Sequence, residues 1–229
     1  MMAGMTMRLS ATASRRYWRA LMANAVSLVD DAAVLLGHGS AGRARALLIL
    51  AEEELARAQA LYNSSVSAWE GHASEVEVPP RSHLAQSRDH REKISAADAY
   101  GQGLGPFWGD YSAWAEGSGG IPGRDPAIVN QTKQDGFYVA STADSQGQFG
   151  SPLDAPAEPV ATELERVAGV VEMAVIEDHT RKQALGTAQD ADSVQDLHAI
   201  VLEHAHPEFC ADFIRAMEER ADYADPDES

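Results

Sequence analysis

The chain has 229 residues, a formal net charge of −17 and a single cysteine, Cys210. This length suits one compact domain with its own core, and one cysteine excludes an intramolecular disulfide, so we expect a cytoplasmic protein. After residue 133, 21 acidic residues face only five basic ones, so nucleic acid could be bound only by local cation clusters earlier in the chain. No run of about 18 apolar residues stands out, and we predict no membrane-spanning helix.

The N-terminal region predicts a disordered leader followed by two helices. Residues 1–13 lack the apolar centre of a signal peptide, and we expect them to be disordered. Apolar residues at helical spacing predict a helix over 14–36, which Gly37-His38-Gly39 ends. Ser40 is a suitable cap for a second helix over 40–69, and the short connection makes the two helices antiparallel neighbours.

The second predicted helix runs from an apolar stretch into three consecutive glutamates. Glu54 lies seven residues after Leu47 and seven before Leu61, so it shares their stripe and is expected to face inward. A buried carboxylate costs several kcal/mol unless it is paired. We therefore predict a partner for Glu54 on a neighbouring helix. The alternative is a structural ion pair or a carboxylate at the edge of the core.

A third helix is predicted over 82–100, after a break at Val78-Pro79-Pro80. His90 shares a face with Ile94, and Lys93 stands one turn after His90. Histidine has an ordinary pKa near neutrality, so beside cations and opposite carboxylates it could transfer a proton during phosphodiester cleavage. We predict that His90 and Glu54 form one polar cluster between the second and third helices. The alternative is a solvated charged face.

The remainder of the chain predicts a long irregular excursion and further helices. Together with the first three helices, this gives an all-α antiparallel bundle. The expected elements are an amphipathic segment at 107–116, an irregular segment at 117–159 with one strand-like run at Phe137-Tyr138-Val139, helices at 160–183, 193–205 and 207–223, and an acidic tail at 224–229.

Several short motifs follow one another in a specific order. They are Asn24-Ala25 through Asp31-Ala32, Glu53-Glu54-Leu55-Ala56-Arg57, Asp89-His90-Arg91-Glu92-Lys93, and Lys133-Gln134-Asp135-Gly136-Phe137-Tyr138-Val139, followed by a proline-containing loop and a helix. Together they resemble the AbiV-type abortive-infection family of HEPN-like helical proteins. The resemblance implies a HEPN-like domain over 14–185, including the irregular segment, with additional C-terminal helices over 186–223.

The resemblance also implies roles for individual residues. The catalytic group comprises His90, Lys93 and Glu54, and the substrate- or phosphate-binding group comprises Glu53, Arg57, Arg88, Arg91, Lys133 and Tyr138. The sequence departs from the family pattern in two respects. It has no arginine followed by four to six residues and then histidine, the pattern of many HEPN ribonucleases. Arg57 also replaces the usual lysine, which retains the charge but changes the donor geometry.

Two functions are consistent with these residues. The first is a phage-defence protein that acts on RNA or the translation machinery, as a metal-independent endoribonuclease, under a phage-encoded activator or antitoxin. The second is a non-catalytic helical module that binds a protein partner and uses its polar cluster for packing. We also predict a homodimer, because the aromatic residues exceed the needs of a small core. These are Tyr62, Trp69, Trp108, Tyr111 and Trp114.

The sequence predicts neither a metal ion nor another cofactor. Glu203-His204-Ala205-His206 holds one Glu-x-x-His motif, whereas a di-iron bundle needs two such motifs and further carboxylates. Gly117-Ser118-Gly119-Gly120 lacks the lysine of a phosphate-binding loop and is expected to be a linker.

Overall fold

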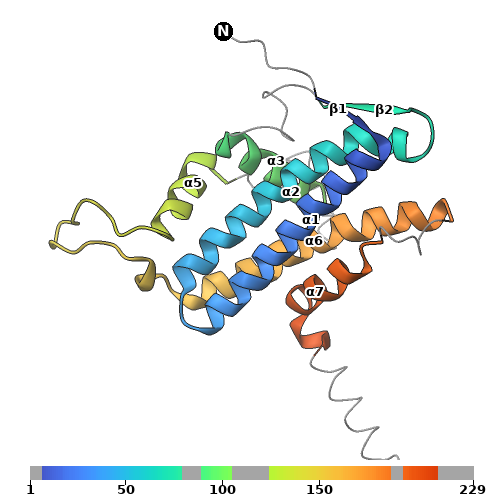
Figure 1. Ribbon diagram of the computed structural model, residues 1–229. Coiled ribbons are helices and arrows are strands. Elements are labelled where there is room, and N and C mark those ends of the chain that lie inside the picture. Colours follow the sequence, from blue (N-terminus) through green and yellow to red (C-terminus); the bar gives the residue numbers. More distant parts are fainter. Residues whose placement is uncertain (1–6, 79–88, 105–123, 187–192, 211–229) are drawn as a thin grey trace, which may run out of the picture.

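The computed structural model describes residues 7–78, 89–104, 124–186 and 193–210. Helices α1 (Ala11–Gly37) and α2 (Ala41–Trp69) form a long antiparallel pair, as predicted (Figure 1). Gly39 makes the turn at φ +76, a conformation that costs glycine little. Ser40 is the residue at the N-cap of α2, but its side chain forms no capping hydrogen bond.

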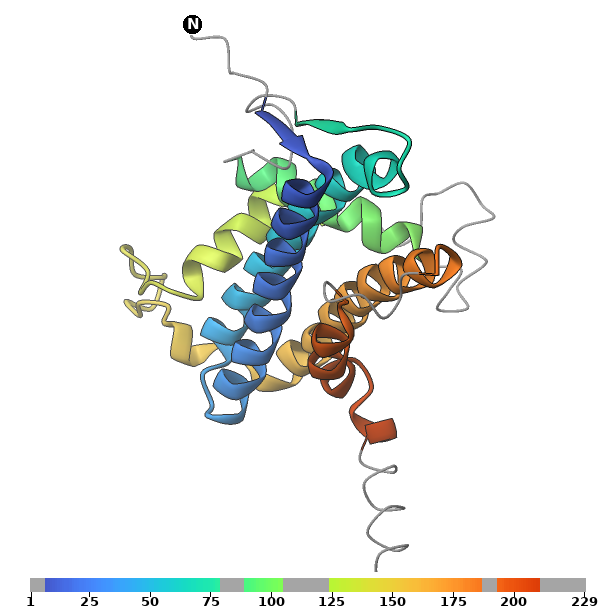
Figure 2. The ribbon, with the colours of Figure 1, turned by 45° about the vertical axis from the view of Figure 1, so that its right-hand side comes forward.

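The other helices pack around this pair. α3 (His90–Gly103) and α5 (Pro126–Asp135) contact α2 and each other, and α6 (Ala157–Ala184) contacts both α1 and α2. α7 (Gln195–Ala205) lies on α6 and α1, on the side of the α1–α2 pair opposite α5 (Figure 2). The prediction of an all-α helical fold is confirmed, with one small two-stranded sheet added.

The core lies where α1, α2 and α6 meet. Trp18, Tyr62 and Trp69 pack their rings together there, with centroids 5.4 to 5.8 Å apart. Tyr62 and Trp69 are therefore part of the core packing and do not support a dimer interface. The other aromatic residues used in that prediction, between 107 and 116, lie outside the described residues.

Two predicted boundaries are wrong: the ordered part of the chain begins earlier than expected, and the third helix begins later. Strand β1 (Met7–Ser10) pairs antiparallel with β2 (Glu75–Val78), so the expected leader is ordered from residue 7. This pairing joins segments far apart in sequence, and four-residue strands carry little local signal. α3 begins at His90 and not near Ser82, because the extended backbone of Asp89 caps it and its carboxylate accepts from Arg91 N at 2.9 Å. Residues 79–88 are not described.

The segment predicted as irregular contains ordered elements. Helix α5 and a 3₁₀ turn, η3 (Pro152–Asp154), both lie within it. The expected strand at Phe137-Tyr138-Val139 is instead a turn, because the amides of Phe137 and Tyr138 both donate to the Gln134 carbonyl at 3.0 Å. The chain there folds back onto the end of α5.

Helix α1 is long and apolar enough to cross a membrane by length and composition, with a window of mean hydropathy 1.5. The sequence-based prediction overlooked this window. In the structure α1 packs along α2 and α6 and buries one face in the core. Its Arg15 forms a bidentate pair with Asp178 of α6 at 2.6 and 2.7 Å. These contacts make α1 an integral helix of the bundle.

The C-terminal predictions are confirmed as far as the described residues extend. α6 and α7 match the helices expected over 160–183 and 193–205. Residues 207–210 are helical, as expected for the start of the last helix. The remainder of that helix and the acidic tail lie outside the described residues.

Candidate functional site

The middle of α2 buries two of its three glutamates. Glu52 and Glu53 are almost completely buried, whereas Glu54 is only partly buried. Several helices surround α2, so its buried surface is wider than the stripe through Leu47 and Leu61, and Leu47 itself is only half-buried. The carboxylate on the side of α3 and α5 is therefore Glu53. Glu54 does lie inward, with its side chain 17% exposed, but the carboxylate pairs with Arg57 of its own helix, so the predicted partner on a neighbouring helix is wrong and the alternative of a structural ion pair holds.

The carboxylate of Glu53 contacts three side chains, which come from α3 and α5. Its Oε2 lies 2.6 Å from His90 Nδ1 and 2.7 Å from Lys93 Nζ, and its Oε1 accepts from Lys133 Nζ. The predicted polar cluster between the second and third helices exists, but its carboxylate is Glu53 instead of Glu54. Lys133, 40 residues further along the chain than Lys93, completes it from α5.

The charges around Glu53 keep it ionised. Burial by itself would raise its pKa, but hydrogen bonds from Lys133, Lys93 and His90 outweigh this and lower the pKa below the ordinary value. A carboxylate can only accept, so the 2.6 Å contact with Glu53 assigns the hydrogen to His90 Nδ1; the Lys133 ammonium, 3.0 Å from the same nitrogen, then donates to Glu53 and not to the ring. In the neutral imidazole, Nε2 then holds the lone pair.

His90 is the accessible part of this cluster. Its side chain is 49% exposed, and its Nε2 has no hydrogen-bond partner among the described residues. A carboxylate that holds the Nδ1–H of a histidine fixes the tautomer and orients the ring, as in acid–base enzymes. This arrangement allows Nε2 to take a proton from a hydroxyl group or return one to a leaving oxygen.

The two lysines do not face solvent. Lys93 is 7% exposed and Lys133 is 3% exposed, and both are paired with Glu53. In this position their charges balance the buried carboxylate. The predicted contact of Lys133 with a phosphate group, and the predicted place of Lys93 in the catalytic group, therefore do not fit the geometry.

Glu54 belongs to a separate pair. Arg57 Nη1 donates to Glu54 at 2.7 Å, and Arg57 Nη2 donates to the Tyr17 hydroxyl of α1 at 2.8 Å. Burial lowers the pKa of Arg57, but the hydrogen bond and charge of Glu54 raise it more. These contacts connect α2 to α1, so Glu54 and Arg57 do not join the His90 cluster.

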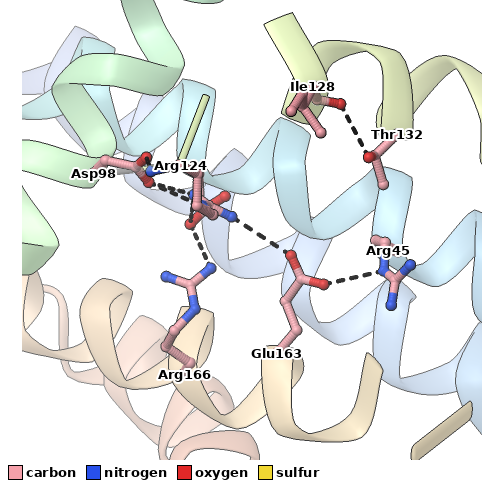
Figure 3. Close-up of polar contacts among 8 residues, drawn as sticks. Arg45, Asp98, Arg124, Ile128, Thr132, Glu163 and Arg166 are labelled. Atoms are coloured by element: carbon pink, nitrogen blue, oxygen red, sulfur yellow. Dashed lines mark hydrogen bonds and ion pairs between the residues drawn. The ribbon is translucent and has the colours of Figure 1, made fainter. Parts of the chain in front are cut away.

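Glu52 forms a second network, on the side of α2 that faces α6 (Figure 3). Its Oε1 accepts from both Arg124 and Arg166 at 2.7 Å, and Arg124 also binds Asp98 of α3. Glu163 of α6 accepts from Arg45 at 3.2 Å and lies 3.6 Å from Arg124. Burial and the charge of Glu52 raise the pKa of Glu163. This network joins α2, α3 and α6 beside the His90 cluster.

The sequence analysis missed the residues of this second network. Their only local signal was the run of three glutamates at the end of an apolar stretch, which indicates more than one buried carboxylate. The arginine partners are 72 and 114 residues away from Glu52. Pairings at such separations are set by helix packing and leave no periodic pattern in the sequence.

The remaining predicted residues lie apart from Glu53. Arg91 follows His90 directly and is exposed, so it remains available for a phosphate group. Tyr138 is 67% exposed and borders a cavity of about 430 Å³ between α2, the end of α5 and η3. Arg88 lies outside the described residues.

Close backbone packing holds α5 in place beside this cavity. A Cβ on Gly136 would lie 2.4 Å from the Gly42 carbonyl oxygen, and a Cβ on Gly42 would lie 2.3 Å from the Pro152 carbonyl oxygen. Real side chains do not approach that closely. The glycine of the Lys133–Val139 motif therefore permits the approach of α5 to α2 that brings Lys133 to Glu53.

Within the described ranges, no group of three or more His, Cys, Asp or Glu side chains is arranged to hold a metal ion. The cluster contains instead one oriented histidine, one carboxylate and two charge-balancing lysines.

Comparison with known families agrees with the fold and motifs. The family model described as AbiV, of the HEPN class, matches residues 13–172. This match covers more than half of the chain, so the chain belongs to the AbiV family of HEPN-type abortive-infection proteins. No curated protein and no solved structure matches the chain.

Proposed function

We propose that this abortive-infection protein acts in the cytoplasm as an endoribonuclease that needs no metal ion, with His90 as the proton-transfer residue. The observation that supports it most is the contact between Glu53 and His90 Nδ1, which leaves Nε2 at the surface. Family membership supports the setting of phage defence.

In the proposed reaction, each residue has a distinct task. His90 Nε2 takes the proton of the ribose 2′-hydroxyl as that oxygen bonds to phosphorus. The bond from phosphorus to the 5′-oxygen breaks, and the imidazolium returns the proton to that leaving oxygen, which gives a 2′,3′-cyclic phosphate and a free 5′-hydroxyl. Glu53 is a positioning residue that holds the ring, and Lys93 and Lys133 keep Glu53 ionised. Arg91 supplies the exposed cation for the phosphate group.

Incubation of purified protein with total RNA in EDTA tests the proposal. We expect cleavage by the wild type and none by a folded His90→Ala variant. His72→Ala is the matched control, because the His72 side chain is 71% exposed and its only described ionic contact is Glu70 at 3.7 Å. Cleavage by His90→Ala at the wild-type rate would overturn the catalytic role.

The burial of both lysines favours a second candidate function, a non-catalytic helical module. In that case the Glu53 cluster fixes α3 and α5 on α2, and the outer faces bind a protein partner. His90→Ala would then lower the melting temperature and change activity only in proportion to the folded protein that is lost. Melting temperature and growth inhibition measured on the same variant separate the two functions.

The proposed partners follow from this function. The substrate is RNA, including RNA of the translation machinery, and a phage-encoded activator or antitoxin controls the protein. We expect cells that carry the wild type to die on infection before phage is released. Cells that carry His90→Ala should instead yield phage like cells without the protein, and protection by that variant would contradict the proposal.

A further inference from the structure

The cavity between α2, the end of α5 and η3 has no part in the reaction described above. Its volume of about 430 Å³ falls within the range of sites that hold small organic molecules. Gly42 and Gly136 line it where α2 and α5 touch, and Gly150 lines it from the segment before η3. Because these residues carry no side chains, the space beside the packed backbones stays open.

Among the described residues that line this cavity, Arg45 is the one cation. Its side chain is 24% exposed, and its Nε donates to Glu163 at 3.2 Å, as Figure 3 shows. Its two Nη groups have no hydrogen-bond or ionic partner among the described residues. Arg45 therefore has a pair of donors left for a ligand in the cavity.

Two carboxylates border the same space. Asp135 is the last residue of α5, and its Oδ1 accepts from Gln131 at 2.7 Å. Asp154 of η3 accepts from the Ser151 amide at 2.9 Å. An ionised carboxylate has about four lone-pair sites, so both can accept further bonds. With one cation and two anions in the lining, a phosphate group is disfavoured, and the ligand that fits is neutral and has donors beside acceptors.

The cavity lies on the same face of α2 as the Glu53 cluster. Gly42 and Ala46 meet the end of α5, and Glu53, seven residues after Ala46, contacts Lys133 of the same helix. Arg45 precedes Glu53 by eight residues, which is about 12 Å along the helix axis. A short stretch of RNA strand can therefore reach from His90 to the cavity.

We propose, on the basis of the proposed ribonuclease function, that this cavity binds a guanine base of the RNA substrate. Guanine presents the acceptors O6 and N7 beside the donors N1–H and N2–H. The Nη groups of Arg45 donate to O6 and N7, the commonest specific contact that proteins make with guanine. Asp135 accepts from N1–H and N2–H, and the exposed ring of Tyr138, which borders the cavity, stacks on the base.

The same arrangement rejects adenine. Adenine has an amino group where guanine has O6, and its N1 is an acceptor. In the cavity the amino group would meet the donors of Arg45, and N1 would meet the carboxylate of Asp135. Each polar group would then lose its bond to water without gaining a partner.

Equilibrium dialysis of the full chain against guanosine, adenosine and inosine tests the site without any cleavage. We expect guanosine to bind at least about tenfold more tightly than adenosine, because a bidentate pair discriminates by about that factor or more. Inosine lacks the N2 amino group and should bind with intermediate affinity. An affinity for guanosine no higher than that for adenosine, or no binding of guanosine, would overturn the proposal.

Matched variants assign the contacts. Arg45→Lys keeps a charge beside Glu163 but offers a single ammonium group, so we expect it to bind guanosine about tenfold more weakly. Asp135→Asn loses one of its two acceptors and should also weaken guanosine binding, whereas Tyr138→Ala should weaken guanosine and adenosine alike. Arg43→Lys is the control, because Arg43 is exposed on α2 and does not line the cavity. Wild-type affinity in folded Arg45→Lys would refute the assignment.

Sequencing of RNA ends after cleavage separates the base site from the reaction. For the wild type we expect guanine at one fixed position relative to the cleaved bond, and for Arg45→Lys we expect this preference to be lost. Guanosine binding by a protein that cleaves no RNA would support the site, for a free guanine nucleoside, and overturn the ribonuclease. Cleavage without guanine preference, by a protein that does not bind guanosine, would overturn the site and leave the ribonuclease standing.

Discussion

Glu53 is the residue on which the other charges of the candidate site depend. Lys93, Lys133 and His90 all contact its carboxylate, and both lysines are buried. Removal of one partner from a buried pair leaves an uncompensated charge, which costs about 3–5 kcal/mol. An exposed or partly exposed pair contributes about 1 kcal/mol or less.

We predict that Glu53→Gln destabilises the protein far more than Glu54→Gln. Glu53→Gln leaves two buried ammonium groups without their carboxylate, whereas Glu54→Gln weakens only the partly exposed pair with Arg57. The expected fall in melting temperature is about 6–20 °C for Glu53→Gln and within about 4 °C for Glu54→Gln. Differential scanning calorimetry at pH 7 measures both, and equal shifts would contradict the assignment of Glu53 as the central carboxylate.

The lowered pKa of Glu53 predicts a pH dependence of stability. A carboxyl group whose pKa is lower in the folded state stabilises the fold above its unfolded-state pKa, near 4.5, and loses this contribution as pH falls through the folded value. The free energy of unfolding should therefore differ between wild type and Glu53→Gln at pH 7, and the difference should shrink below pH 4.5. Urea titrations at a series of pH values test this, and a difference that grows toward acid would contradict it.

At the scale of secondary-structure elements, the position of α5 decides whether Lys133 reaches Glu53. The helix is short, and its end approaches α2 where neither Gly42 nor Gly136 has room for a Cβ. Its N-terminus is held by the Arg124 network and its end by these glycine contacts. Both attachments are needed because α5 has a single completely apolar buried residue, Val129.

We predict that Gly136→Ala displaces α5 and destabilises the protein by about 1–3 kcal/mol, since the added methyl group overlaps the backbone of α2. Gly37→Ala is the control, because a Cβ at Gly37 meets nothing within 4 Å and alanine favours the helix. Urea midpoints measure stability, and the rate of proteolysis within residues 137–151 reports the displacement. Equal behaviour of the two variants would show that α5 tolerates the methyl group.

At the scale of the whole molecule, the surface bears an apolar set near the cavity beside α5. Exposed apolar side chains that form a contiguous patch commonly mark a contact surface. The exposed residues of this set are Ile128, Phe137, Tyr138, Val139, Phe149 and Leu153.

We predict that the protein forms a homodimer through this set. Light scattering at micromolar concentration should give twice the monomer mass of 24.5 kDa, and Phe149→Ser should weaken association. Leu185→Ser, at an exposed apolar position beyond the end of α6, is the control and should associate like the wild type. A mass of 24.5 kDa throughout the micromolar range would refute the dimer.

The sequence by itself determined the long helices and their order. Apolar periodicity over more than 20 residues located α1, α2 and α6 to within a few residues, because burial of a helix face repeats along the chain. It also indicated buried acid in α2 and the motif residues His90, Lys93 and Lys133, which the structure brings together.

Only the tertiary structure decided which glutamate of α2 contacts His90, Lys93 and Lys133. Successive helix positions differ by about 100° in direction, so Glu52, Glu53 and Glu54 each face a different neighbour. The packing of the other helices around α2 therefore determines the partner of each glutamate. The same holds for β1 and β2, for the start of α3 at His90 and for the ordered turn after α5. These features depend on contacts between distant segments, on a single capping bond or on two local turn hydrogen bonds, and none of these produces a repeating pattern in the sequence.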